Sequence, residues 1–134
     1  MFPINYWALI VSVIATLILG FLWYGPFFGK AWMKLVGLAP EQRPKPSSAL
    51  VMIICTILMA YALKFNILAG SAYLNVHGVQ AGLQAAFWNW LGFIATVITG
   101  IVLHERRSWK LWLINAGFYL VSLAIIGIIL SVWV

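Results

Sequence analysis

The chain has 134 residues, of which 65% are hydrophobic and only 7% are charged. A soluble domain is about 45–50% apolar and about 25% charged, so this composition excludes a soluble fold and predicts an integral membrane protein. The net charge is +6, but the basic residues flank apolar stretches. This pattern favours contact with anionic lipid head groups over nucleic-acid binding.

Four apolar stretches are long enough to cross a bilayer, for which a helix needs about 20 residues. We predict spans over residues 5–25, 48–68, 79–103 and 110–133, all within a single transmembrane domain of residues 1–134. Four spans that alternate in direction, two of the three connectors being short turns, make this an all-α, antiparallel bundle of four transmembrane helices. After the first span, GKAWMKLVGL predicts a short interfacial helix with Lys30 and Lys34 on one side.

Small side chains indicate where these helices pack. The first span has a small residue at every fourth position, in a stripe formed by Ala8, Ser12, Thr16 and Gly20. We interpret this stripe as a helix-packing face, with the lining of a polar pathway as the alternative. The third span has a face, at about 100° per residue, that predicts its buried seam. That seam comprises Gly82, Ala85, Ala86, Asn89, Phe93, Thr96 and Gly100.

The basic residues predict how the chain is threaded. The first connector carries Lys30, Lys34, Arg43 and Lys45, and the third carries Arg106 and Arg107 with Lys110 beside them. By the positive-inside rule these connectors are cytoplasmic, and both termini lie outside the cytoplasm of the cell (inner) membrane. Lys64 is the one charge inside an apolar run. It is either a lysine that reaches the interface or a counter-charge at a cavity mouth.

Groups that catalyse reactions are scarce in this sequence. The two carboxylates, Glu41 and Glu105, lie in connectors beside basic residues. His77 and His104 lie at opposite ends of the third span, about 40 Å apart along a helix. We therefore predict no catalytic pair, no metal site and no cofactor, and we expect that the protein is not an enzyme.

Polar residues within the spans leave two interpretations open. They form hydrogen bonds between helices, or some of them line a small cavity for a neutral, aromatic or cationic ligand. The candidate cavity residues are Asn89, Trp90, Asn115 and Tyr119. Small multidrug-resistance exporters are similar in size and span number, but they depend on a glutamate in the first span. The absence of acids from every span disfavours that mechanism.

The stretch GFLWYGPFFGKAW, residues 20–32, carries a spaced motif of Trp23, Tyr24, Gly25, Pro26, Gly29 and Trp32. With WLGF (90–93) and LINAGFYL (113–120), it resembles a bacterial membrane family, domain-of-unknown-function family seventeen sixty-one. The resemblance covers most of the chain. It implies a compact four-span membrane protein and no catalytic residue.

On the residues alone, Trp-Tyr before Gly-Pro is typical of a chain that leaves a span at the interface and stops its helix. The second Gly and Trp make the motif more specific. We predict that this corner packs on the bundle and holds the following helix against the cytoplasmic face.

Two functional hypotheses lead from this sequence. The first is a small transporter or channel that works as a homo-oligomer, because four short helices enclose little space. The alternative is a non-catalytic accessory or scaffold protein that binds lipid or a partner subunit. A membrane enzyme acting on lipid ranks third, since it needs a reactive group. A cavity holding Asn89 and Asn115 favours transport, and a fully packed bundle favours the accessory role.

Overall fold

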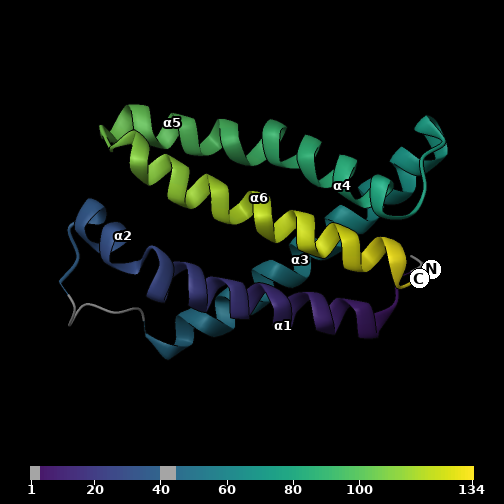
Figure 1. The fold of residues 1–134 in the computed structure, drawn as a ribbon, viewed down its shortest axis with the longest axis horizontal. Coiled ribbons are helices and arrows are strands. Elements are labelled where there is room, and N and C mark those ends of the chain that lie inside the picture. The colour runs from purple at the N-terminus through teal and green to yellow at the C-terminus, as the bar shows by residue number, and fades with distance from the viewer. Residues whose placement is uncertain (1–3, 40–44) are drawn as a thin grey trace.

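The computed structural model describes residues 4–39 and 45–134, and this part of the chain forms helices joined by short connectors (Figure 1). Two of the helical segments, η1 and η2, are π-helices that continue a preceding α-helix. The elements in chain order are α1 (Tyr6–Leu22), η1 (Trp23–Phe27), α2 (Gly29–Val36), α3 (Pro46–Leu74), α4 (Gly78–Asn89), η2 (Trp90–Ala95), α5 (Thr96–Glu105) and α6 (Trp109–Val132).

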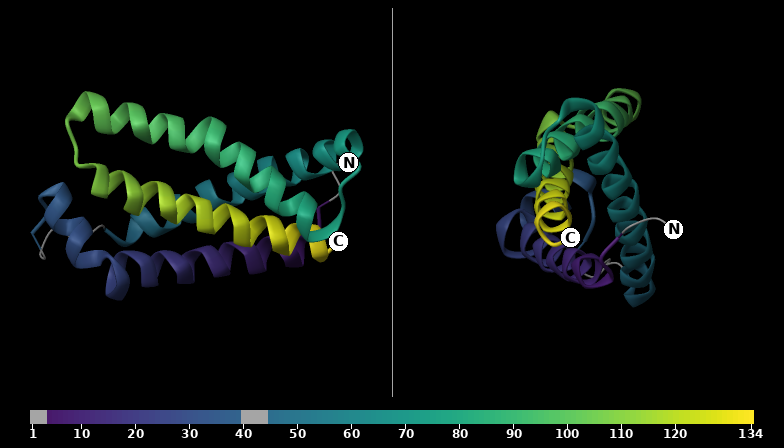
Figure 2. Two further views of the ribbon diagram at one scale, coloured as in Figure 1. Left: turned by 45° about the horizontal axis from the view of Figure 1, so that its top comes forward. Right: turned by 90° about the vertical axis from the view of Figure 1, so that its right-hand side faces the viewer.

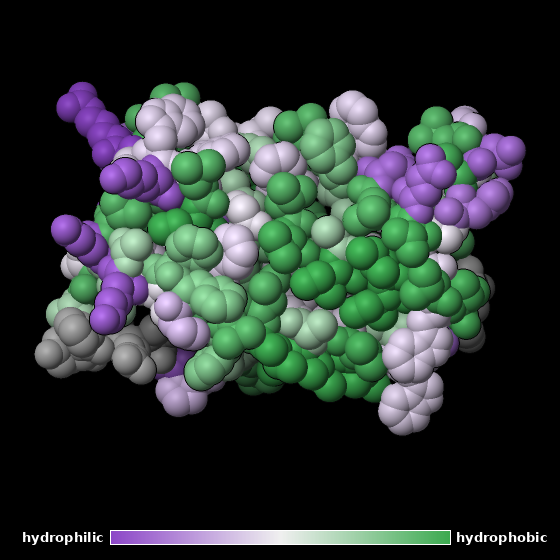
Figure 3. Space-filling model, viewed as in Figure 1, coloured by the Kyte–Doolittle hydropathy of each residue, from purple (hydrophilic) through white to green (hydrophobic). Residues whose placement is uncertain are grey.

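Four helical stretches are long and apolar enough to cross a membrane: Tyr6–Phe27, Pro46–Leu74, Gly78–Glu105 and Trp109–Val132. The shortest has 22 residues. It rises about 33 Å, against about 30 Å of hydrocarbon. Figure 3 shows apolar side chains across the middle of the molecule and hydrophilic ones at both ends. The predicted four-span helical bundle is confirmed, as is a short helix, α2, after the first span.

Helix α6 is the centre of the bundle, because it contacts α1, α2, α3, α4, α5 and η2. Figures 1 and 2 show α1 on one side of α6 and the α4–α5 helix on the other, with α3 crossing behind. The two backbones of α4 and α6 meet at Gly82 and Gly127. A Cβ atom on Gly127 would lie 2.5 Å from the Gly82 carbonyl oxygen, so neither position has room for a side chain. Sequence reasoning found Gly82 but not its partner.

The stripe predicted in the first span is a packing face at Ala8 and Ser12, whereas Thr16 and Gly20 also line a cavity. Ala8, Ser12 and Thr16 are buried, and a Cβ on Gly20 would touch the Phe118 ring of α6 at 3.6 Å. Small side chains on this face therefore let α1 approach its neighbours closely.

The seam predicted along the third span is correct only at its start. Ala85 and Ala86 are buried, whereas Phe93 is 73% exposed. The difference arises at η2, because a π-helix holds more residues per turn than an α-helix. A face projected at a constant α-helical period therefore turns away from the core beyond Trp90.

The second span is longer than predicted. Helix α3 continues past Leu68 to Leu74, and the connector to α4 begins at Asn75, which has a left-handed φ of 53°. Gly70, which lies beyond the predicted end of this span, is a packing position. The space that a Cβ would take there is filled by the Gln84 side chain of α4, whose Cδ would lie 3.5 Å away.

Lys64 fits neither interpretation offered by its sequence. Its side chain is only 5% exposed, and its Nζ donates a hydrogen bond to the Leu130 carbonyl oxygen at 3.0 Å. That carbonyl is in the last turn of α6, where the helix dipole favours a cation. The lysine therefore joins α3 to the end of α6, and its side chain does not line a cavity.

Candidate ligand-binding cavity

The corner formed by η1 packs directly on α6. The Trp23 indole Nε1 donates to the Ile114 carbonyl oxygen at 2.9 Å, and the Tyr24 hydroxyl donates to Asn115 Oδ1 at 2.7 Å. Both rings also contact Phe118, with centroid separations of 6.3 Å from Trp23 and 5.2 Å from Tyr24. These contacts fix the point at which the chain leaves the first span.

The Gly25-Pro26 pair does not stop the helix, contrary to the sequence-based expectation. Residues Trp23–Phe27 continue as a π-helix with Pro26 inside it. A proline ring in an α-helix clashes with the carbonyl four residues earlier, and the wider π turn relieves that clash. The residue before a proline also avoids helical conformation because its Cβ meets the ring, and Gly25 has no Cβ.

Gly29 is the point where α2 folds back over the corner. It is buried, and a Cβ atom there would lie 2.5 Å from the Tyr24 carbonyl oxygen. One turn further on, the Trp32 ring packs edge-on against the Tyr24 ring at a centroid distance of 5.4 Å. The spaced motif thus builds one rigid turn between α1 and α2.

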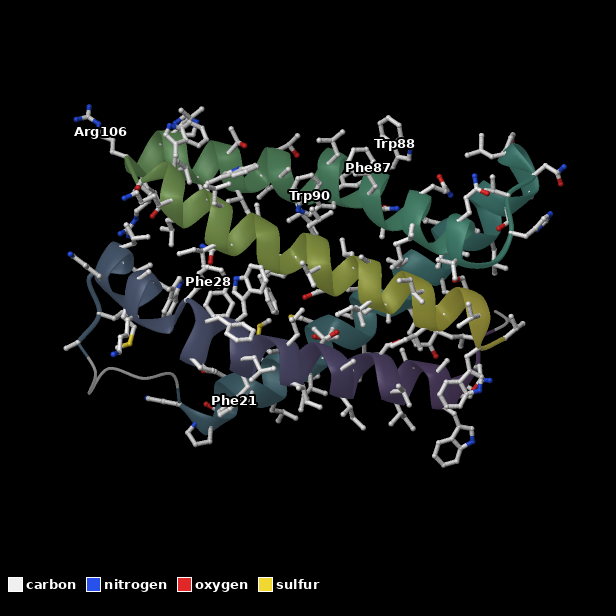
Figure 4. The ribbon with its side chains drawn as sticks, viewed as in Figure 1. Phe21, Phe28, Phe87, Trp88, Trp90 and Arg106 are labelled. Atoms are coloured by element: carbon white, nitrogen blue, oxygen red, sulfur yellow. The ribbon has the colours of Figure 1, made fainter. Side chains whose placement is uncertain are left out.

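Trp90 repeats the role of Trp23 on the other flank of α6. It is the first residue of η2, and its Nε1 donates to the Ala116 carbonyl oxygen at 2.8 Å. Figure 4 shows Trp90 pointing toward α6, whereas Phe87 and Trp88 lie on the outer side of α4. The two indoles therefore bind the carbonyls on either side of Asn115. π-Helical turns are frequent at functional sites, and here two of them bond to the same turn of α6, at residues 114–116.

A cavity of about 1,210 Å³ lies beside this level of α6. Its walls come from α1, η1, α2, α3, α5 and α6. Most of the wall is apolar, as at Leu17, Met52, Met59, Ile98 and Val102. The cavity occupies one half of the bundle: along α6 its lining runs from Leu111 to Ser122 and goes no deeper.

Three of the hydroxyl groups in the cavity wall already donate within their own helices. Those of Thr16, Thr56 and Ser122 donate to carbonyls one turn earlier in their own helices, at 2.8, 2.7 and 2.7 Å. They offer a ligand little more than an apolar surface.

Two other polar groups remain available. Asn115 accepts a hydrogen bond from Tyr24 through Oδ1, and its Nδ2 has no partner among the described residues. The Tyr119 hydroxyl likewise has no hydrogen bond within the part of the chain that the structure describes. Both residues line the cavity, so both can bond to a ligand.

The four residues predicted to share one cavity are divided among three places. Asn115 and Tyr119 line the large cavity. Asn89 lines a pocket of about 260 Å³ between α3 and α4, and its Nδ2 donates to the Ala85 carbonyl oxygen at 2.8 Å. Trp90 lines neither space. Helix α4 contacts both α3 and α6, and its Gln84 and Asn89 side chains line the pocket beside α3. Sequence spacing cannot reveal which neighbour a polar position meets.

The basic residues Lys30, Lys45 and Arg107 also line the large cavity, and sequence reasoning assigned them only to topology. Their clustering depends on α2, the start of α3 and the α5–α6 connector meeting at one end of the bundle. Among the described residues, no three His, Cys, Asp or Glu side chains are grouped as a metal site requires.

The fold and this cavity define a class: a four-span helical membrane protein with a ligand-sized cavity in one half of the bundle. The chain belongs to the family described as a protein of unknown function (DUF1761), whose model matches residues 7–131. The resemblance inferred from the sequence is therefore confirmed. Searches of curated proteins and of solved structures give no match.

Proposed function

We propose that this protein binds a membrane amphiphile, with long apolar chains and a polar head, in the cavity beside Asn115, and that it does so without catalysing a reaction. The cavity carries the proposal. Its volume of about 1,210 Å³ exceeds the range of about 300–1,000 Å³ usual for small-molecule pockets. Its apolar walls suit hydrocarbon chains, and its two free polar groups suit a polar head.

The shape of the bundle supports binding over passage across the membrane. Beyond Ser122 the helices close together, with Gly82 against Gly127 and buried Ile126 and Leu130 filling the core. A cavity confined to one half of a packed bundle suits a lipid-binding accessory protein better than a channel. One chain forms this cavity by itself, so binding requires no second subunit. Homo-oligomer formation stays a separate prediction.

Native mass spectrometry of the protein released in mild detergent tests this proposal. We expect about one retained lipid for each chain. Ala49 lines the cavity, so Ala49→Trp should displace that lipid. Ala62 is also an exposed alanine of α3 but lies outside the cavity, so Ala62→Trp is the matched control and should keep the lipid.

The same spectra can also contradict the proposal. A wild-type chain that carries no lipid, or two tryptophan variants that retain it equally, contradicts binding in this cavity. The subunit count in these spectra also tests the expected homo-oligomer.

We further propose that the cavity opens at the cytoplasmic face of the cell (inner) membrane. Figure 3 shows hydrophilic side chains projecting at the end where α2 and the α5–α6 connector lie. Apart from Lys64, the described lysines and arginines belong to segments at that end: Lys30, Lys34, Lys45, Arg106, Arg107 and Lys110. The positive-inside rule supports a cytoplasmic location for them.

Cysteine labelling in intact cells checks this orientation. Cys55 is the one cysteine, so a Cys55→Ala background carries no thiol. We expect Asn75→Cys, in the α3–α4 connector, to react with a membrane-impermeant maleimide. Lys34→Cys, in α2, should react only after the cells are lysed. The reverse pattern contradicts the proposed orientation.

A further inference from the structure

We infer that the amphiphile is an anionic phospholipid whose phosphate is bound at the rim of the cavity by Lys30, Lys45 and Arg107. This inference rests on the proposed binding of an amphiphile. The three cations come from three separate elements, namely α2, the residue before α3 and the α5–α6 connector, yet all line the same space. No carboxylate among the described residues lines it with them.

The one acidic residue that the structure describes, Glu105, leaves the rim positive. Glu105 Oε1 lies 3.8 Å from Arg107 Nη2, and the two side chains are 53% and 39% exposed. Such a long, solvent-screened ion pair is weak. The Arg107 guanidinium can therefore still bind a phosphate through two parallel hydrogen bonds.

Local backbone geometry places each cation at the rim. Lys30 follows Gly29, whose contact with Tyr24 fixes the start of α2. Arg106 ends α5 with a left-handed φ of 53°, and the next amide, Arg107 N–H, donates to the Val102 carbonyl oxygen at 3.0 Å. This turn separates the two arginines: Arg107 lines the cavity, whereas Arg106 extends away from the bundle (Figure 4).

The start of α3 adds to the positive potential. Lys45 precedes Pro46, and the first turn of the helix lines the cavity through Pro46, Ser48 and Ala49. The N-terminal end of a helix carries partial positive charge that favours a phosphate nearby.

The polar groups follow the order found along a phospholipid. Asn115 lies about 1.7 turns into α6, about 9 Å below its start, and Tyr119 lies about 15 Å below that start. A glycerophospholipid has its ester carbonyls just below the phosphate and its hydrocarbon chains below those. The free Nδ2 donor of Asn115 is therefore suited to an ester carbonyl, and Met52 and Met59 to the chains.

The chain supplies a matched control for this site. Lys34, Arg106 and Lys110 belong to the same end of the bundle but do not line the cavity. One triple variant carries Lys30→Gln, Lys45→Gln and Arg107→Gln, and the control carries Lys34→Gln, Arg106→Gln and Lys110→Gln. Both lose the same charge, so general attraction to an anionic surface falls equally in both.

The experiment is a competition for retention by the protein in mild detergent, between phosphatidylglycerol and phosphatidylcholine with identical acyl chains, read by native mass spectrometry. We expect wild type and control to prefer phosphatidylglycerol by about tenfold or more, because several cations contact one head group. The cavity variant should keep lipid but lose that preference. A third variant with Lys30→Arg, Lys45→Arg and Arg107→Lys should retain it, which separates charge from folding.

Any other result of this competition contradicts one specific part of the proposal. Equal loss of preference in the cavity variant and the control assigns the effect to surface charge rather than to the rim. Retention of both lipids by wild type without preference rejects the anionic head group but leaves amphiphile binding intact. Retention of neither lipid rejects the proposed function itself. Displacement of phosphatidylglycerol by soluble glycerol phosphate indicates a site for free phosphate compounds and rejects the lipid.

Discussion

Substituting Gly82 with alanine is expected to destabilise the folded protein by about 1–3 kcal/mol, the usual range for overpacking a close contact. The added methyl group meets the Gly127 carbonyl of α6, and that backbone atom cannot move aside as a side chain could. The helices must therefore separate where α4 and α6 approach most closely. The thermal unfolding midpoint in mild detergent measures the effect.

Gly100→Ala is the control for this substitution. Gly100 lies in α5 of the same span, and nothing lies within 4 Å of the position of its missing Cβ. Alanine is favoured over glycine inside a helix by about 0.5–1 kcal/mol, so this variant should melt at or above the wild-type midpoint. Equal midpoints for the two variants contradict a close crossing at Gly82.

Gly29→Ala is expected to lower the stability of the folded protein by a similar amount, but through the turn between α1 and α2 rather than through a helix crossing. Its methyl group would lie 2.5 Å from the Tyr24 carbonyl oxygen, so the turn between α1 and α2 must open. Helix α2 then moves away from α6 and takes Lys30, Trp32 and Met33 out of the cavity wall. We expect a loss of about 1–3 kcal/mol in stability and, in addition, reduced lipid retention.

The control for Gly29→Ala is Gly92→Ala. Gly92 is the third residue of η2, and no atom lies within 4 Å of its missing Cβ. That variant should keep both stability and retained lipid. If Gly29→Ala melts at a lower temperature but retains as much lipid as wild type, that result contradicts a role for α2 in the cavity.

The spans could be predicted from sequence because the bilayer sets their length. The Ala8–Thr16 stripe and the start of the third-span seam were also predictable, since only small residues allow helices to touch. These features depend on local periodicity and composition. They need no knowledge of which helix meets which.

The rest of the structure depends on contacts between distant segments. The π-helices at Trp23 and Trp90 change the helical period, and nothing in a window around Phe93 shows that the face has turned. Gly82 meets Gly127, and Lys64 is buried against Leu130. Neither contact can be predicted without knowing which helices pack against each other. The cavity itself exists where helices diverge, so sequence placed Asn115 and Tyr119 correctly in one face but joined them wrongly to Asn89.

The depth of the cavity along α6 also bears on the ligand proposed for it. Between Leu111, near the open end, and Ser122, the last residue of α6 to line the cavity, the helix rises about 16 Å. A tail of the proposed lipid that enters from the rim reaches the end of the cavity lining on α6 at that depth. We therefore expect the proposed lipid site to select tails by length as well as heads by charge, because a tail longer than this depth must bend out between the helices into the bilayer.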